Sequence, residues 1–219
     1  MSLGVSRDGG LAERAWVAPQ CARPLPAGVR VEDACLVEPL AVALHGIHRA
    51  GVEPGSTVLV IGAGPVGLCT IAASRAQGTE VDLLAHRPDR FDAAVRLGAG
   101  PATGSEYDVV FDAAGTQGSI GAAIDRVRPG GTVAVLGTFW EPVSLGLGFQ
   151  MKEVTLVPAF AYGHHHEDAE FDGAISLLER SPDLPSVLIT HRFPLDDAAE
   201  AFRVAADRES GAIKVVLEP

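Results

Sequence analysis

The most regular pattern of hydrophobic and polar positions begins at Thr57. A short apolar and β-branched run over Thr57–Ile61 is typical of a strand that is covered on both faces of a sheet. It ends in a glycine-rich turn, Gly62–Gly67, and small and apolar residues over Leu68–Ala76 then predict a helix. A second strand is expected over Val81–Leu84. The segment therefore predicts a complete strand–helix–strand unit.

The alternation continues beyond this unit. Helices are expected over Asp89–Leu97 and Ser119–Val127, and strands over Asp108–Asp112 and Thr132–Leu136. An apolar run over Lys152–Phe160 has the character of a last strand. Because strands that alternate with helices imply a parallel sheet, the expected fold class is α/β, with a doubly wound parallel sheet of the Rossmann type.

The character of the sequence changes near Gly51, which is the first expected boundary. Partial alternation over Leu11–Val17 suggests a strand, and apolar residues at helical spacing over Val31–Ala50 predict a helix that Pro39 interrupts near its start. We therefore expect three segments, 1–50, 51–160 and 161–219, of which the middle one holds the predicted sheet.

Composition narrows the range of partners. The chain of 219 residues has a formal net charge of −11, which argues against binding to nucleic acid or an anionic membrane, because both need a basic surface. No apolar run approaches the roughly 18 to 20 residues that cross a bilayer, and the first residues lack the features of a secretory signal. Three widely spaced cysteines match neither a disulfide framework nor a structural zinc motif, so we expect a cytoplasmic protein.

The glycine turn carries the most specific chemistry. Gly62 would allow the tight turn that leaves the strand, Gly64 would let the backbone approach a pyrophosphate, and Gly67 would let the helix pack against the strand. Pro65 and Val66 would begin the helix, whose N-terminus offers unpaired N–H groups to phosphates. The alternative is a glycine-rich turn with no ligand. The strand before it and the helix after it favour a dinucleotide-binding turn.

The residues after the second strand bear on the choice of cofactor. NAD enzymes usually carry an acidic residue there that binds the ribose, but this chain has Ala85, followed by His86 and Arg87. A carboxylate would repel a 2′-phosphate, whereas an arginine can bind one. The sequence therefore favours NADP(H), with NAD(H) as the alternative, unless Arg87 only begins a solvated helix.

Other candidate residues follow from position. Ala113 and Gly137 come after the carboxyl ends of two predicted strands, where open parallel sheets bind ligands, and are candidates for nicotinamide contacts. The consecutive histidines His164–His166 could collect a metal ion, but adjacent residues share no face of a regular element, so we interpret them as surface histidines.

Together these segments resemble the zinc-type medium-chain dehydrogenase/reductase superfamily, in the branch that holds sorbitol and threonine dehydrogenases. The resemblance covers nearly the whole chain, and its carriers are Gly9–Glu13, Val37–His45, Val58–Gly67, Asp108–Gly115, Arg128–Thr132, Lys152–Leu156, Phe193–Phe202 and Gly211–Leu217. It implies transfer of hydride between a nicotinamide cofactor and a small alcohol or carbonyl substrate. It also implies that 1–50 and 161–219 are remnants of a GroES-like catalytic domain at both ends, and that a basic residue at Lys214 reaches the cofactor pyrophosphate.

The resemblance also sets out where this chain departs from the family. Members hold a catalytic zinc through a cysteine and a His-Glu pair, and neither segment is present here. Glu38 matches a glutamate that faces the zinc in relatives, but one residue cannot make a zinc site, so zinc is expected to be absent. The link from Gly98 to Asp108 is short, which predicts a trimmed sheet edge. Family precedent at Lys152–Phe160 predicts a homodimer or a homotetramer.

Three alternatives stay open from the sequence. The first is a non-catalytic dinucleotide-binding or sensor module, which the absent zinc ligands favour. The second is a zinc-free quinone reductase of the same superfamily, although Val37–Leu40 is closer to the zinc branch. The third is a methyltransferase, whose glycine-rich loop also follows a first strand. It would need an acidic residue where Ala85 stands.

Overall fold

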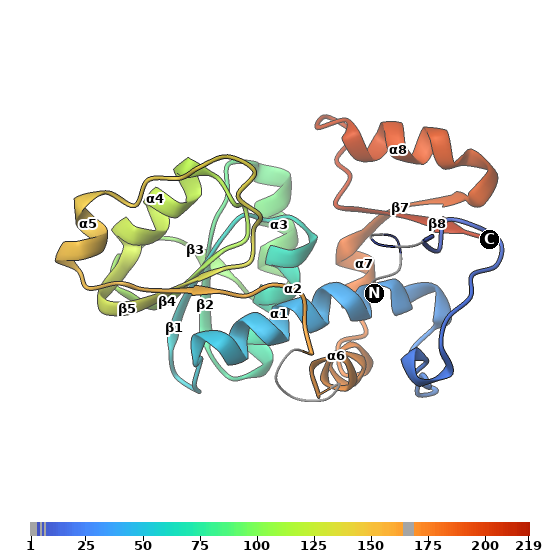
Figure 1. Cartoon of the computed structure of the whole chain (residues 1–219), viewed down its shortest axis with the longest axis horizontal. Helices are drawn as coiled ribbons and strands as arrows, with labels where there is room; N and C mark the ends of the chain where they lie inside the picture. Colours follow the sequence, from blue (N-terminus) through green and yellow to red (C-terminus); the bar gives the residue numbers. More distant parts are fainter. Residues whose placement is uncertain (1–3, 5, 7, 164–168) are drawn as a thin grey trace.

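The computed structural model of the chain describes residues 4, 6, 8–163 and 169–219. Its α-helices are α1 (Val37–Ala50), α2 (Pro65–Ala76), α3 (Pro88–Arg96), α4 (Gln117–Arg126), α5 (Gly146–Met151), α6 (Ala169–Glu179), α7 (Leu184–Leu188) and α8 (Ala198–Ala206). Its strands are β1 (Thr57–Ile61), β2 (Glu80–Leu84), β3 (Gly100–Pro101), β4 (Tyr107–Asp112), β5 (Val127–Val135), β6 (Thr155–Pro158), β7 (Ile189–Pro194) and β8 (Lys214–Glu218). In Figure 1 the sheet built from β1 to β6 lies on one side, and α8 with β7 and β8 lies on the other.

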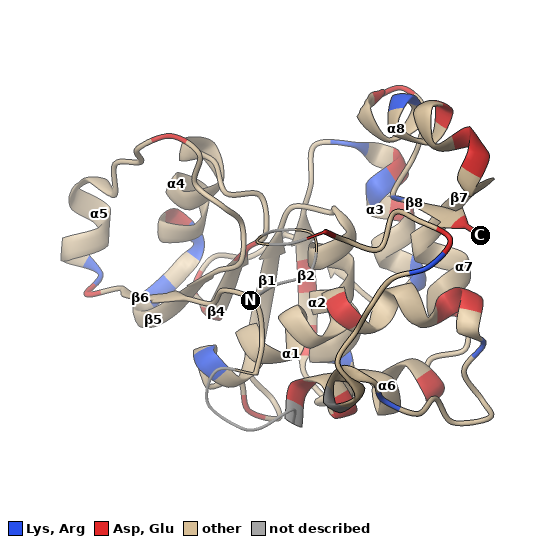
Figure 2. Cartoon of the chain, turned by 45° about the vertical axis from the view of Figure 1, so that its right-hand side comes forward, with Lys and Arg blue, Asp and Glu red and all other residues tan. Residues whose placement is uncertain are grey.

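Charge is unevenly distributed over these elements. Acidic residues are spread over much of the chain, including α6 and α8, and basic segments lie among them, some of them beside α3 (Figure 2). Helix α3 itself has charges of both signs, with Asp89 and Asp92 beside Arg90 and Arg96.

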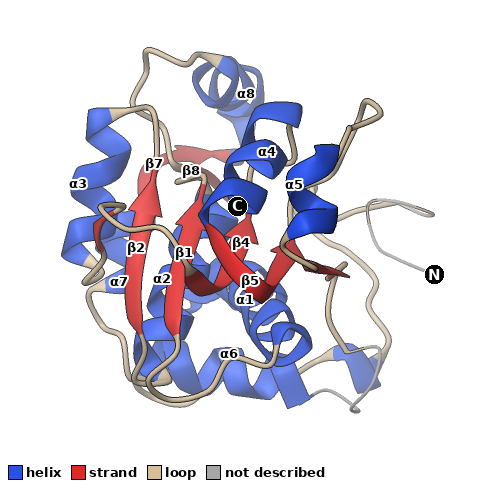
Figure 3. Cartoon of the chain, turned by 90° about the vertical axis from the view of Figure 1, so that its left-hand side faces the viewer, coloured by secondary structure: helices blue, strands red, loops and turns tan. Residues whose placement is uncertain are grey.

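The large sheet has six strands in the order β3-β2-β1-β4-β5-β6, and every pair is parallel. β1 lies between β2 and β4, so the chain moves outward in one direction to β3 and then returns to the other side of β1. This reversal is the switch point at which open α/β sheets bind ligands, beyond the carboxyl ends of the strands. Figure 3 shows the sheet with helices on either side.

Alternate residues of β1 explain why helices cover both faces. Val58 and Val60 belong to the core that α1 and α2 share, whereas Leu59 and Ile61 belong to a second core with Ile120 of α4. Because successive strand residues point to opposite faces, a strand that is apolar at every position must be covered twice. The continuous apolar run of β1 thus specifies a central strand.

Most elements lie where the hydrophobic pattern predicts them, and the trimmed sheet edge is confirmed, but two expectations need correction. Leu11–Val17 is not a strand: it forms no regular element, and Trp16 is 94% exposed. The break near Pro39 comes earlier, because a 3₁₀ turn over Val31–Leu36 precedes α1, and Pro39 lies in the first turn of α1, where N–H groups have no helical partner. The trimmed edge keeps a two-residue strand, β3, with no helix between it and β4.

The segments before β1 and after β6 pack on each other. Helix α6 lies against α1, and Arg192 of β7 donates to Asp33 at 2.7 Å. β7 and β8 pair in parallel as a second, two-stranded sheet, and α8 connects them. His45 of α1 is buried and contacts Glu170 of α6 at 3.3 Å, so it is a packing histidine. None of the helices in the described part of the chain combines the length and the hydrophobicity that a membrane crossing needs.

Candidate functional site

The turn after β1 is built around glycine. Gly62 has a φ of +103°, and a Cβ there would lie 3.2 Å from backbone atoms of Ala113 and Ala114. Its N–H donates to the Leu84 carbonyl at 3.1 Å, which joins the ends of β1 and β2. A positive φ and the close backbone of Ala113 and Ala114 make any residue other than glycine strained here. Gly62 therefore lets the chain turn inside the gap between β2 and β4.

Gly64 and Gly67 differ in the space around them, which is open at Gly64 and closely packed at Gly67. A Cβ on Gly67 would lie 1.9 Å from the Gly62 carbonyl oxygen, so α2 can approach the turn only because this residue has no side chain. A Cβ on Gly64 would meet nothing within 4 Å. Gly67 is thus needed for packing, whereas the space in front of Gly64 is open. An open space beside a bare backbone is what a phosphate group would require.

Helix α2 begins at this open space. Gly64 is the N-cap, Pro65 is the first helical residue, and no side chain caps the helix. The first N–H groups of a helix have no intrahelical partner, and they carry partial positive charge. The N-terminus of α2 is therefore free to bind an anion.

A cleft of about 700 Å³ lies over the carboxyl ends of β1, β2 and β4. Its wall contains three arginines and no carboxylate, and it consists of Ile61, Gly62, Ala63, Gly64, Leu84, Ala85, His86, Arg87, Arg90, Ala113, Ala114, Thr116, Gly118, Ser119, Ala122 and Arg208. In a protein with an excess of acidic residues, this composition suits an elongated anionic ligand with an apolar part.

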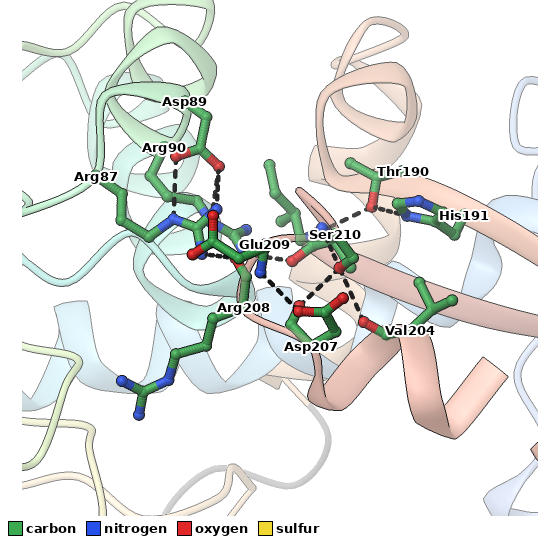
Figure 4. A network of polar contacts seen from close by, with 12 residues as sticks. Arg87, Asp89, Arg90, Thr190, His191, Val204, Asp207, Arg208, Glu209 and Ser210 are labelled. Carbon is green, nitrogen blue, oxygen red and sulfur yellow. Dashed lines mark hydrogen bonds and ion pairs between the residues drawn. The ribbon is translucent and has the colours of Figure 1, made fainter. Parts of the chain in front are cut away.

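Arg87 is already paired in the structure. Its Nε and Nη2 donate to the two carboxylate oxygens of Asp89 at 3.0 and 2.8 Å (Figure 4). These hydrogen bonds to the Asp89 carboxylate raise the pKa of Arg87 above its ordinary value. The pair is half-exposed, so solvent screens it, and Asp89 neutralises part of the charge that the sequence assigns to phosphate recognition.

Arg90, one turn further along α3, makes fewer hydrogen bonds to the described residues than Arg87 makes. Its Nη1 is buried and has no hydrogen-bond partner, and the Asp89 carboxylate is 3.7 Å from its Nε. Burial and the neighbouring Arg87 charge lower the pKa of Arg90. A buried guanidinium nitrogen without a partner is costly unless a ligand supplies an acceptor.

The loop between α8 and β8 closes the cleft from the C-terminal segment. Arg87 donates to the Arg208 carbonyl, and Arg90 donates to the Ala212 carbonyl. Ser210 fixes the loop internally, because its hydroxyl donates to the Val204 and Asp207 carbonyls at 2.9 and 2.8 Å (Figure 4). Arg87 at the N-cap of α3 and Arg90 within it thus hold backbone that lies about 120 residues away in sequence.

The loops after β4 and β5 form the other end of the site. The buried Asp112 accepts from the N–H groups of Ala114 and Gly115 at 3.0 and 2.9 Å, which shapes the loop that contains Ala113. A Cβ on Gly137 would lie 2.3 Å from the Gly115 nitrogen, so these loops touch backbone to backbone. Beside them Thr116 caps α4 by accepting from the Ser119 N–H at 3.1 Å.

The structure brings together only part of the predicted residue set. Gly62, Gly64, His86, Arg87 and Ala113 line the cleft, whereas Pro65, Val66, Gly67, Gly137 and Lys214 do not. Lys214 is half-buried in β8. Burial raises the pKa values of the Cys35 and Cys69 thiols, and the positive charge of Lys214 offsets part of that rise.

Sequence reasoning missed two basic residues, Arg90 and Arg208. Arg90 follows Arg87 by three residues on a predicted helix, which is a detectable signal. No local pattern marks Arg208.

The residues present do not fit a zinc ion. Glu38 is exposed in the first turn of α1, and the described residues contain no group of three or more potential ligands placed to hold a metal. The histidines His164–His166 lie outside the described residues.

Comparison with known proteins agrees with this geometry. Residues 31–218 match the family described as the glucose dehydrogenase C-terminus. The chain is 33% identical over 214 residues to L-arabinitol 4-dehydrogenase of Aureobasidium melanogenum, a match that covers 85% of this chain and 56% of that protein. It is 30% identical over 236 residues to L-galactonate-5-dehydrogenase of Escherichia coli, which covers 98% of this chain and 67% of that protein. The chain therefore spans between half and about two thirds of these relatives.

A solved structure has the same fold. A Sinorhizobium meliloti protein, described as a zinc-binding dehydrogenase bound to NADP, matches with a TM-score of 0.87 and 26% identity, over 100% of this chain and 68% of that one. The strand order, the glycine turn and the family match all point to the same fold family. The chain belongs to the glucose dehydrogenase C-terminus family, the carboxyl-terminal part of the zinc-type medium-chain dehydrogenases.

Proposed function

We propose that this chain binds a nicotinamide dinucleotide across the carboxyl edge of its sheet, as the cofactor-binding part of an alcohol or polyol dehydrogenase. The observation that carries the proposal is the cleft of about 700 Å³, in which the glycine turn, the start of α2 and three arginines meet. A bound nicotinamide supplies hydride-transfer chemistry. The relatives named above are dehydrogenases of sugar alcohols and sugar acids, which supports a small polyhydroxy substrate.

The chain's own residues would bind and orient the dinucleotide. Gly62 and Gly64 have no side chains, so they would let the pyrophosphate approach the backbone closely. The N–H groups at the start of α2 would donate to it. Ala113 and the loop that ends at Gly137 lie beyond β4 and β5, on the side where the nicotinamide would rest. Lys214 would add positive charge near α2, since it already acts on Cys69 of that helix.

We further propose that NADP(H) is preferred over NAD(H). Ala85 places no carboxylate at the ribose, and Arg87 and Arg90 both line the cleft there. Arg90 has a buried nitrogen that lacks an acceptor, and a 2′-phosphate would provide one. Asp89 competes for Arg87, so the two arginines share a role that the sequence assigns to Arg87 alone.

Calorimetric titration with both cofactors tests the preference. We expect NADP(H) to bind about ten-fold or more tightly than NAD(H), since charge-assisted hydrogen bonds contribute about 1.5 to 3 kcal/mol each. Arg87→Ala and Arg90→Ala should each reduce that gap and leave NAD(H) binding nearly unchanged. Arg96→Ala is the matched control, because Arg96 lies on the same helix and bonds Ser186 instead. Equal affinities, or tighter binding of NAD(H), would refute the preference.

A second function is favoured by one observation. Because the described residues hold no set of metal ligands, the chain by itself suits a dinucleotide-binding module without turnover. Cofactor binding together with no oxidation of any member of a polyol panel would support this alternative, and measurable turnover would exclude it. In either case we propose that 1–50 and 161–219 derive from a catalytic domain and flank the cofactor-binding segment 51–160.

We also propose that the chain forms a homodimer or a tetramer of dimers. β6 is the edge strand of the sheet, and large apolar side chains are exposed in the segments around it. Trp140, Leu147, Met151 and Phe160 are between 68% and 86% exposed. An open strand edge beside apolar residues is typical of a surface that pairs with a second copy. Sedimentation that shows only monomer at micromolar concentration would contradict the proposal.

A further inference from the structure

We propose that Arg208, in the loop between α8 and β8, binds the pyrophosphate of the dinucleotide and thereby ties the C-terminal segment to the bound cofactor. The inference rests on the proposed dinucleotide binding and adds a residue from outside the sheet. Arg208 lines the same cleft as Gly62 and Gly64 but comes from the loop between α8 and β8, outside the large sheet. It would therefore hold the ligand from the side that the start of α2 does not reach.

Among the three arginines of the cleft, Arg208 differs because its side chain has no partner within the described residues. Arg87 bonds Asp89 through two nitrogens, and Arg90 bonds the Ala212 carbonyl. Within the described residues, the Arg208 guanidinium makes no hydrogen bond and no ion pair, although its own carbonyl accepts from Arg87. An exposed arginine with all its donors free is available to an anion at little cost, because no existing contact has to be broken.

The direction of the side chain indicates which phosphate it would bind. In Figure 4 the Arg208 side chain extends away from the pair formed by Arg87 and Asp89. The ribose end of the cleft is marked by Arg87 and Arg90 after β2, and the pyrophosphate end by Gly64 at the start of α2. Because the Arg208 guanidinium extends away from the ribose end of the cleft, we expect it to bind the pyrophosphate and not a 2′-phosphate.

The backbone of the loop is held in position before any ligand binds. Arg87 and Arg90 donate to the carbonyls of Arg208 and Ala212, and the Ile213 N–H donates to Thr190 of β7 at 2.9 Å. A loop fixed on both sides loses little conformational entropy when its side chain binds a ligand. Cofactor contact through Arg208 would thus link the small sheet of β7 and β8 to the large sheet.

The test compares two cofactors that share a pyrophosphate but differ at the 2′ position. Calorimetric titration of the full chain with NADP⁺ and NAD⁺ should show that Arg208→Ala weakens both by the same factor, about ten-fold, which corresponds to about 1.4 kcal/mol. Binding of adenosine 2′-phosphate, which has no pyrophosphate, should stay unchanged. Arg208→Lys should recover part of the loss. Arg203→Ala is the control, because Arg203 is an exposed arginine of α8 that already pairs with Glu200 at 2.8 Å.

The outcomes separate this inference from the proposed function. Equal loss for both cofactors, with the adenosine 2′-phosphate affinity retained, supports the assignment. Unchanged binding by Arg208→Ala overturns it while dinucleotide binding stands, and so does a loss confined to NADP⁺ and adenosine 2′-phosphate, which would place Arg208 at the ribose. If the unmodified chain binds neither dinucleotide, the proposed function fails and this inference fails with it.

Discussion

Two glycines of the same turn should respond in opposite ways to the same substitution. A methyl group at Gly67 would lie 1.9 Å from the Gly62 carbonyl oxygen, which is more than an ångström inside normal contact, and the atom it meets is backbone. Helix α2 or the turn must therefore move. Overpacking of this kind costs about 1 to 3 kcal/mol, and we expect Gly67→Ala to lie at the upper end because no flexible side chain can yield.

Gly64→Ala should leave the free protein almost unchanged. Its φ of −78° is accessible to alanine, and the new methyl group would meet nothing within 4 Å. Alanine is a slightly poorer N-cap than glycine but restricts the unfolded chain, so the two small effects oppose each other. We expect the stability to change by no more than about 0.5 kcal/mol. Binding of the dinucleotide should instead fall sharply, because the methyl group occupies the open space in front of α2.

Thermal unfolding and calorimetric titration of both variants provide the measurement. For a chain of this length, about 1 kcal/mol shifts Tm by roughly 2 to 4 °C, so Gly67→Ala should melt about 6 to 12 °C lower and Gly64→Ala within about 2 °C of the original. Equal melting temperatures would refute the packing argument for Gly67. Full cofactor affinity in Gly64→Ala would refute the assignment of the open space to a phosphate.

Three further predictions concern other parts of the molecule. Burial and the hydrogen bond to Asp82 raise the pKa of Tyr107 from 10.0 to about 12, so its contribution to stability is complete below pH 10 and is lost as the pH rises towards 12. Ultraviolet titration of Tyr107→Phe should lack the component near pH 12, and its persistence would contradict the assignment. Burial alone would raise the pKa of Glu170, but hydrogen bonds from His45, His48 and the Gly163 N–H lower it below 4.5, so Glu170 stabilises the fold above that pH and less as the pH falls through the lowered value. Glu170→Gln should lose about 1 to 3 kcal/mol near pH 7 and flatten the acid limb of the stability curve, whereas the exposed Glu179→Gln should do neither. Zinc should not bind stoichiometrically, since Glu38 has no companion ligands among the described residues, and one tightly held zinc per chain after a chelator wash would show that prediction to be wrong.

The sequence by itself determined the features that depend on local geometry. The apolar, β-branched run Val58–Ile61 indicated a strand covered on both faces, because alternate residues of a strand point to opposite sides. The spacing of Gly62, Gly64 and Gly67 predicted the turn, and Gly67 answers a local steric demand, because a Cβ there would meet the Gly62 carbonyl oxygen. The atoms that a Cβ on Gly62 would meet belong to Ala113 and Ala114, which only the fold brings close. Leu11–Val17 shows the limit of this reasoning, because a short alternating pattern becomes a strand only if another strand is there to pair with it.

The partners of the charged residues were decided only by the tertiary structure. From the sequence, Arg87 is a free cation at the ribose position. Asp89, only two residues away, pairs with it, whereas the fold joins Arg87 to the Arg208 carbonyl and leaves a buried nitrogen of Arg90 without an acceptor. Arg208 lies 121 residues from Arg87 and reaches the cleft in the loop between α8 and β8, where Arg87 donates to its carbonyl. Backbone preferences act over a few residues, whereas electrostatic pairing depends on which groups the packed chain brings within a few ångströms of one another. The position of the dinucleotide turn can therefore be predicted from neighbouring residues in the sequence. The arrangement of charges that faces a bound dinucleotide forms only when the chain folds.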